Sequence, residues 1–167
     1  MAGLRPDGDQ LRLLLAQDEV SVLVSLLDGL AGRVAAVSAG SEPDAVIARL
    51  IPTVSRGDAE LDVELRAMLR DELLETRTQR LGALASDLRA WAAESGGAVD
   101  RALERDGAMR IVEALNDVRL ALATTIGYDE ELRESLDPDD ARSDALVLMD
   151  ALAWMQGTLI EFVEGEA

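Results

Sequence analysis

The spacing of apolar residues predicts helices over most of this chain. From residue 16 to residue 37, apolar positions recur at alternating steps of four and three, which places them on one helical face. This stripe consists of Ala16, Val20, Leu23, Leu27, Leu30, Val34 and Val37. Gly40 is a stop signal for that helix. Ser41, with Pro43 two residues on, is the expected N-cap of a short second helix that ends before Pro52.

Residues 57–95 have helical character almost throughout. One apolar stripe consists of Leu61, Leu65 and Met68, and a second consists of Leu74, Leu81, Leu84, Leu88 and Trp91. A single straight helix of this length would extend about 50 Å at 1.5 Å per residue. The other predicted helices are near half that length, so we expect a break or bend near residues 69–71.

Two short segments have the pattern of strands. Residues 1–16 predict a β-hairpin, because Asp7-Gly8 is a strong turn signal and Leu11 to Leu15 can form the second strand. The outer edge of that second strand has unpaired backbone groups, so we expect another element to cover it. Residues 98–103 are the candidate for a third strand beside it.

Two apolar helices are expected at the carboxyl end, over residues 104–127 and 141–164, joined by an acidic connector. On a helical wheel, one face of the first helix collects Ile111, Leu115, Val118, Leu122 and Ile126, and nearly the opposite side collects Met109, Leu120 and Ala123. A helix that is apolar on two sides is typically sandwiched between neighbours. Between these faces lies a narrow polar strip that we expect to be solvated: Arg110, Glu113, Asp117 and Thr124.

The last helix also has two apolar stripes. Its core face collects Ala145, Leu148, Met149, Leu152, Leu159, Ile160 and Val163, with Gln156 in the middle. The second stripe consists of Val147, Ala151, Trp154, Thr158 and Phe162. This second stripe either packs inside the monomer, which we favour, or forms a surface for a second copy or another protein.

A buried Gln156 needs hydrogen-bond partners. Asn116 and Arg119 flank the apolar faces of the preceding helix and are candidates, and Asp150 is placed to neutralise Arg119. The favoured interpretation is a structural polar contact that fixes two core helices in register. The alternative is a ligand or partner pocket at this position.

These patterns together predict a mainly α protein: a single-domain helical bundle over residues 1–167 with a small N-terminal β-hairpin. Composition limits its chemistry. The chain has no His, Cys or Lys; its sixteen basic residues are all Arg, against 33 Asp and Glu, and its net charge is −17. Serine–histidine catalysis, thiol chemistry and histidine or cysteine metal sites are excluded. We expect no catalytic residue, no cofactor and no metal.

The charge also predicts the kind of partner. A strongly acidic protein repels phosphate backbones, and with four aromatic residues it has no stacking surface for nucleic acid, so we expect no direct nucleic-acid binding. The longest apolar run, residues 145–160, is short and contains Asp150, so no membrane span is expected. The expected location is the cytoplasm, and the expected partner is a protein with a basic surface, with a homodimer as a further option.

Two C-terminal segments carry a family resemblance. Residues 113–127 read EALNDVRLALATTIG and residues 151–163 read ALAWMQGTLIEFV. With the Arg-Pro-Asp-Gly-Asp hairpin, they resemble an actinobacterial family of unknown function, some members of which are labelled AosR-like oxidative-stress transcriptional regulators. Matches to its two motifs are Leu115, Asn116, Asp117, Arg119, Leu120, Trp154 and Gln156.

The resemblance implies a helical cytoplasmic protein with a regulatory or interaction role and no established reaction. Thiol redox sensing is ruled out here, because the chain has no Cys. Our first hypothesis is therefore a non-enzymatic regulator that acts through protein contacts, with an apolar anchor such as Trp154. The alternative is a small-ligand binder or carboxylate-based enzyme that uses Asn116, Arg119 and Gln156, and a self-associating structural protein is the third.

Overall fold

The computed structural model describes residues 3–51, 54–55, 57–137 and 139–165. Residues 1–2 and 166–167 of the expected 1–167 domain therefore lie outside the described residues. The fold is mainly α, as predicted, with a small antiparallel sheet. The helices in chain order are α1 (Gln17–Ser38), α2 (Ala45–Leu50), α3 (Ala59–Glu94), α4 (Arg105–Ile126), α5 (Glu130–Ser135) and α6 (Ser143–Glu164).

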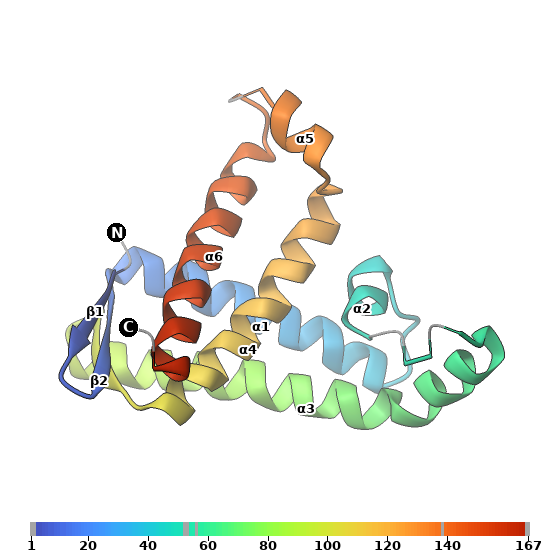
Figure 1. The fold of residues 1–167 in the computed structure, drawn as a ribbon, viewed down its shortest axis with the longest axis horizontal. Helices are drawn as coiled ribbons and strands as arrows, with labels where there is room; N and C mark the ends of the chain where they lie inside the picture. The colour runs from blue at the N-terminus through green and yellow to red at the C-terminus, as the bar shows by residue number, and fades with distance from the viewer. Residues whose placement is uncertain (1–2, 52–53, 56, 138, 166–167) are drawn as a thin grey trace.

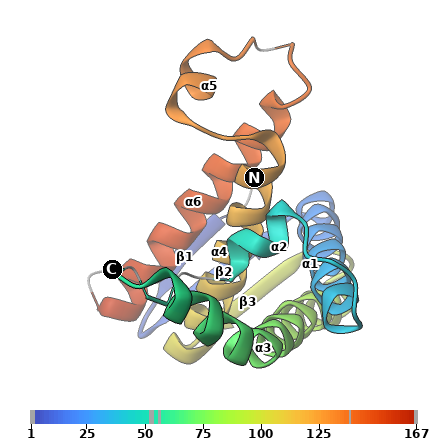
Figure 2. The same ribbon diagram turned by 90° about the vertical axis from the view of Figure 1, so that its right-hand side faces the viewer.

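Two long helices form a base from which a helical hairpin rises. α1 and α3 lie side by side along the long axis of the molecule, and α4 and α6 extend away from them, with α5 at the far tip (Figure 1). The view at right angles shows the same arrangement, with α1 and α3 adjacent and seen nearly end-on (Figure 2). The hairpin helices α4 and α6 pack against each other, and α2 packs against α4.

The sheet lies at one end of the base and has the order β1-β2-β3. The expected hairpin is present: β1 (Gly3–Asp7) pairs with β2 (Gln10–Leu15), and Gly8 in the turn has a φ of +64°. The expected third strand is also present as β3 (Val99–Leu103), which pairs antiparallel with β2. Leu11, Leu13 and Leu15 alternate with half-buried residues, so one face of the sheet joins the core.

The predicted stripe of α1 is buried against the rest of the fold. Its buried positions are Val20, Leu23, Leu27, Leu30, Val34 and Val37. The second predicted stripe of α3 is buried too, at Leu74, Leu81, Leu84 and Leu88. These two sets share one continuous apolar core, which also includes residues of α2, α4 and α6. The regular three-and-four spacing of both helices therefore explains why they lie side by side.

One local prediction is wrong, and a second, of a break or bend near residues 69–71, holds only as a change of direction in a continuous helix. Ser41 is not the N-cap of α2; that position is taken by Asp44, whose side chain accepts a hydrogen bond from the Ile47 amide at 3.0 Å. Arg33 also donates to the Asp44 carboxylate, and the two contacts lower the pKa of Asp44. The expected break near residues 69–71 is absent, because α3 is continuous over 36 residues. Its first turns are nevertheless inclined to the remainder (Figure 1).

The burial of α4 predicts a clear difference between two of its apolar side chains. Leu115 is fully buried, whereas Met109 is exposed. We expect Leu115→Ala to lower the free energy of unfolding by about 2–5 kcal/mol, because it leaves a cavity in the core. Met109→Ala should change it by less than about 1 kcal/mol. Urea unfolding followed by circular dichroism measures both; equal losses would show that the α4 face is wrongly assigned.

Candidate functional site

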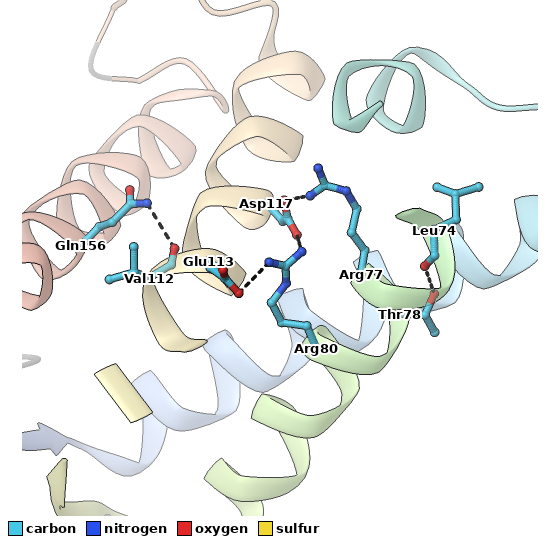
Figure 3. Close-up of polar contacts among 8 residues, drawn as sticks. All are labelled: Leu74, Arg77, Thr78, Arg80, Val112, Glu113, Asp117 and Gln156. Atoms are coloured by element: carbon cyan, nitrogen blue, oxygen red, sulfur yellow. Dashed lines mark hydrogen bonds and ion pairs between the residues drawn. The ribbon is translucent and has the colours of Figure 1, made fainter. Parts of the chain in front are cut away.

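The most buried charged group in the described part of the chain is the Asp117 carboxylate on α4, which is 1% exposed. Arg77 and Arg80 approach it from α3, and Figure 3 shows Asp117 between their guanidinium groups. Arg77 Nη1 donates to Asp117 Oδ1. Arg80 Nη2 lies 3.4 Å from Asp117 Oδ2, and Arg80 Nη1 donates to Glu113 Oε2 at 2.8 Å. We call these four residues the α3–α4 ion cluster.

This cluster corrects the prediction that Asp117 lies on a solvated strip. The helical wheel places Asp117 beside polar residues, but α3 packs over that side of α4 and covers it. A signal for the contact was present in α3. Arg77 follows Leu74 by three residues and precedes Leu81 by four, so it occupies an apolar position within a buried stripe. An arginine at such a position needs an acidic partner on the facing helix.

The chemistry of the ion cluster is that of a structural contact. Its two arginines and two carboxylates balance in formal charge, which lowers the cost of burying them. Their hydrogen bonds are incomplete: within the described residues, Arg77 Nε, Arg80 Nε and Asp117 Oδ2 have no hydrogen-bond partner. Arg80 and Asp117 Oδ2 therefore interact as an ion pair, because their arrangement does not meet the geometry of a hydrogen bond. The four charged groups are therefore paired with one another across α3 and α4.

Gln156 and Arg119 form the polar contact expected between the two C-terminal helices. Gln156 is 7% exposed, and its Oε1 accepts a hydrogen bond from Arg119 Nη1 at 2.5 Å. Its Nε2 donates to the Val112 carbonyl of α4 at 3.2 Å, as Figure 3 shows. The amide group is thus satisfied on both atoms by α4. This geometry agrees with a contact that fixes α4 and α6 in register.

Asn116 and Asp150 are not part of this contact. Asn116 is exposed on α4. Asp150 pairs with Arg133 of α5 through two hydrogen bonds of 3.0 and 2.8 Å, and does not neutralise Arg119. Hydrogen bonds from Arg133 to Tyr128 and Asp150 raise the pKa of that guanidinium. The expected pocket residues are therefore divided among three places: the buried contact, the surface of α4 and an ion pair at the tip of the hairpin.

The second apolar stripe of α6 is largely exposed. Val147 is 70% exposed and Trp154 is 51% exposed, and Ala151 lies between them on the same face. Phe162, at the end of the stripe, is buried. We call Val147, Ala151 and Trp154 the α6 outer face. The favoured prediction that this stripe packs inside the monomer is therefore wrong for these three residues and holds for Phe162.

A trough of about 240 Å³ lies between α1 and the side of α6 that carries Leu148, Leu152 and Met155, and its rim includes Ala151 of the α6 outer face. Val22 of α1 contributes to its wall and is itself exposed. Ala151 and Leu148 contribute from α6, and Asp18 and Glu19 add carboxylates at the start of α1. The result is an apolar depression with acidic residues beside it. By length and composition alone, α1 and α6 are each apolar enough to cross a membrane, although no span was expected from the sequence; core helices of soluble proteins meet the same criterion.

The described residues give little support for a metal site. Among them, no group of three or more Asp or Glu side chains is arranged to hold a metal ion. The position expected for a ligand pocket is occupied by Arg119 and Gln156, which bond to each other. A far larger groove lies elsewhere, between α3, β3 and α4.

The ion cluster gives a stability prediction. Asp117→Ala leaves two partly buried guanidinium groups without their shared carboxylate, so the free energy of unfolding should fall by about 3–5 kcal/mol. Glu113→Gln is the control, because Glu113 is exposed and, within the part of the chain that the structure describes, pairs with Arg80 alone; the loss for this variant should be below about 1 kcal/mol. Chemical denaturation of both variants makes the comparison. A loss below 1 kcal/mol for Asp117→Ala would mean that the carboxylate is solvated.

Comparison with known proteins identifies a family. No curated protein and no solved structure matches the chain. A family model does match, and it covers residues 1–163, which include the ion cluster, the Gln156 contact and the α6 outer face. The chain belongs to the family described as a domain of unknown function, DUF2017.

Proposed function

We propose that this protein is a non-enzymatic regulator that binds a basic protein partner through the α6 outer face. The observation that carries the proposal is the exposure of Trp154 and Val147 on a strongly charged molecule, on a face whose third residue, Ala151, lines the trough. Tryptophan is the residue type most enriched among the anchors of protein interfaces. An exposed apolar face next to a depression is typical of a docking surface.

The charge of the protein favours a basic partner over a second copy of this chain. At a net charge of −17, two copies repel each other as they approach, whereas a cationic protein is attracted and steered to the surface. Asp18 and Glu19 place negative charge beside the trough itself. The apolar face then supplies the contact that holds the complex, and the acidic rim supplies its orientation.

The regulatory part of the proposal rests on the resemblance to AosR-like proteins, together with a side-chain inventory that lacks His, Cys and Lys. Regulation by a thiol switch is not part of it. The proposed place of action is the cytoplasm, in keeping with a Cys-free chain. The alternative of a ligand-binding or carboxylate enzyme site at Asn116, Arg119 and Gln156 is less well supported, because Asn116 is exposed and the other two bond to each other.

Affinity purification with the full chain as bait tests the proposal. We expect the wild type to retain a partner with a basic surface that is released as salt screens the charges. Trp154→Ala should weaken binding of the purified partner by about 2 kcal/mol, roughly thirtyfold in Kd, because an anchor is removed from the centre of the contact. Isothermal titration calorimetry measures the change.

Met68→Ala is the matched control. Met68 is 78% exposed on α3, away from the α6 outer face, and its replacement should leave the Kd unchanged within twofold. Two further measurements distinguish other occupants of the face. Sedimentation that reveals a dimer broken by Trp154→Ala would assign the face to a second copy, and binding to lipid vesicles that depends on Trp154 would assign it to a membrane. Either result, or equal binding by both variants, would overturn the proposal.

A further inference from the structure

A groove of about 1070 Å³ runs between α3, β3 and the first turns of α4. It shares no residue with the trough beside α6. The wall from α3 extends from Thr76 to Trp91, and the wall from β3 includes each residue from Asp100 to Leu103. Such a length suits an extended chain segment better than a compact small molecule.

β3 is an edge strand. It pairs with β2 on one side, and no strand in the described part of the chain pairs with its other side. An edge strand presents unpaired backbone N–H and C=O groups that can accept a further strand. Because consecutive residues of β3 line the groove, its free edge borders the space. A bound segment can therefore add to the sheet by β-augmentation, with its main chain supplying hydrogen bonds.

The groove carries an excess of negative charge. Its five carboxylates are Asp87, Asp100, Glu104, Asp106 and Glu113, and its three guanidinium groups are Arg80, Arg101 and Arg110.

Internal ion pairs account for only part of this charge. Asp100 pairs with Arg12 at 2.6 Å, and Glu113 pairs with Arg80 at 2.8 Å. Within the described residues, Asp87, Glu104 and Asp106 have no ion pair. The groove is therefore better matched to a cationic ligand than to an anionic one.

Trp91 lies in the groove wall beside these charges. Its ring is half-buried in the groove wall, and the Arg101 guanidinium carbon lies 5.6 Å from the ring centroid. This is the distance at which a cation is attracted by the face of an aromatic ring. Arg101 therefore already uses this ring, and the carboxylate that this wall offers to a ligand cation is Asp87, which lies one helical turn before Trp91.

We propose that this groove binds an extended, basic segment of a partner protein, which adds to the sheet as a strand beside β3 and directs Arg or Lys side chains toward Asp87, Glu104 and Asp106. The groove is a second surface, and its use does not depend on the α6 outer face. Hydrogen bonds to the free edge of β3 hold the main chain of the bound segment, and the groove carboxylates select positively charged side chains at its alternate positions.

A capped hexapeptide of alternating arginine and valine is the probe. It is titrated into the ¹⁵N-labelled full chain, and amide chemical shifts are followed by NMR. We expect the largest shifts in Val99–Leu103 and around Asp87 and Trp91. Two further versions of the peptide are each methylated at alternate amide nitrogens, one at the odd positions and one at the even positions. In one of them the methyl groups replace the N–H groups that pair with β3. That version should bind at least tenfold more weakly. A glutamate–valine peptide should not bind.

Two double variants of equal charge separate site binding from general attraction. Asp87→Asn with Asp106→Asn should weaken the peptide Kd about tenfold, whereas Glu130→Gln with Glu134→Gln on α5 should change it by less than twofold. If the double variant does not fold, Asp87→Asn and Asp106→Asn are tested singly, and each is expected to weaken binding. Trp154→Ala should bind the peptide normally, which separates this proposal from the one for α6. Equal losses in both double variants, full binding of both methylated peptides, or shifts away from β3 would overturn the proposal.

Discussion

The contact of Asp117 with Arg77 and Arg80 is the interaction on which the placement of the helical hairpin depends. Apolar contacts between α3 and α4 tolerate small sliding movements, but a buried carboxylate between two guanidinium groups has few arrangements that keep it paired. The cluster therefore fixes where α4 crosses α3. Gln156 then fixes α6 to α4 through Val112 and Arg119. Two polar contacts in series thus connect the base to the outermost helix.

Ion pairs within the chain also explain how an acidic chain folds around an apolar core. Several arginines form ion pairs with carboxylates of the same chain, such as Arg12 with Asp7 and Asp100, and Arg89 with Asp28. These pairs are exposed and contribute little stability each. The remaining carboxylates give the surface its negative field, which keeps copies of the chain apart and attracts cations. The exposed apolar residues of α6 therefore lie on a molecule with a strongly negative net charge.

Periodicity predicted the elements of this fold well and the faces of α4 poorly. The stripe of α1 follows from its local spacing, whereas the strand at residues 98–103 was expected because the edge of the N-terminal hairpin needs a neighbour. The burial of Asp117 depends on a partner 40 residues earlier in the chain, which a helical wheel cannot include. The prediction that Asp150 neutralises Arg119 is wrong for the same reason, since its actual partner, Arg133, lies in the segment expected to be a connector. Polar residues near apolar faces are ambiguous until the facing helix is known, whereas the Gln156 contact was predictable because a buried amide requires partners.

The two proposed surfaces are connected through α4. Glu104 is the single residue between β3 and α4, and it lines the groove. From there α4 runs to the contact with Gln156, which holds the helix that carries the α6 outer face. A partner that engaged both surfaces would lose little entropy in ordering this protein, and its second contact would form at a high effective concentration. Because both surfaces favour cationic ligands, one basic partner with an extended segment and an apolar pocket would satisfy both, and the affinity would exceed that of either contact alone.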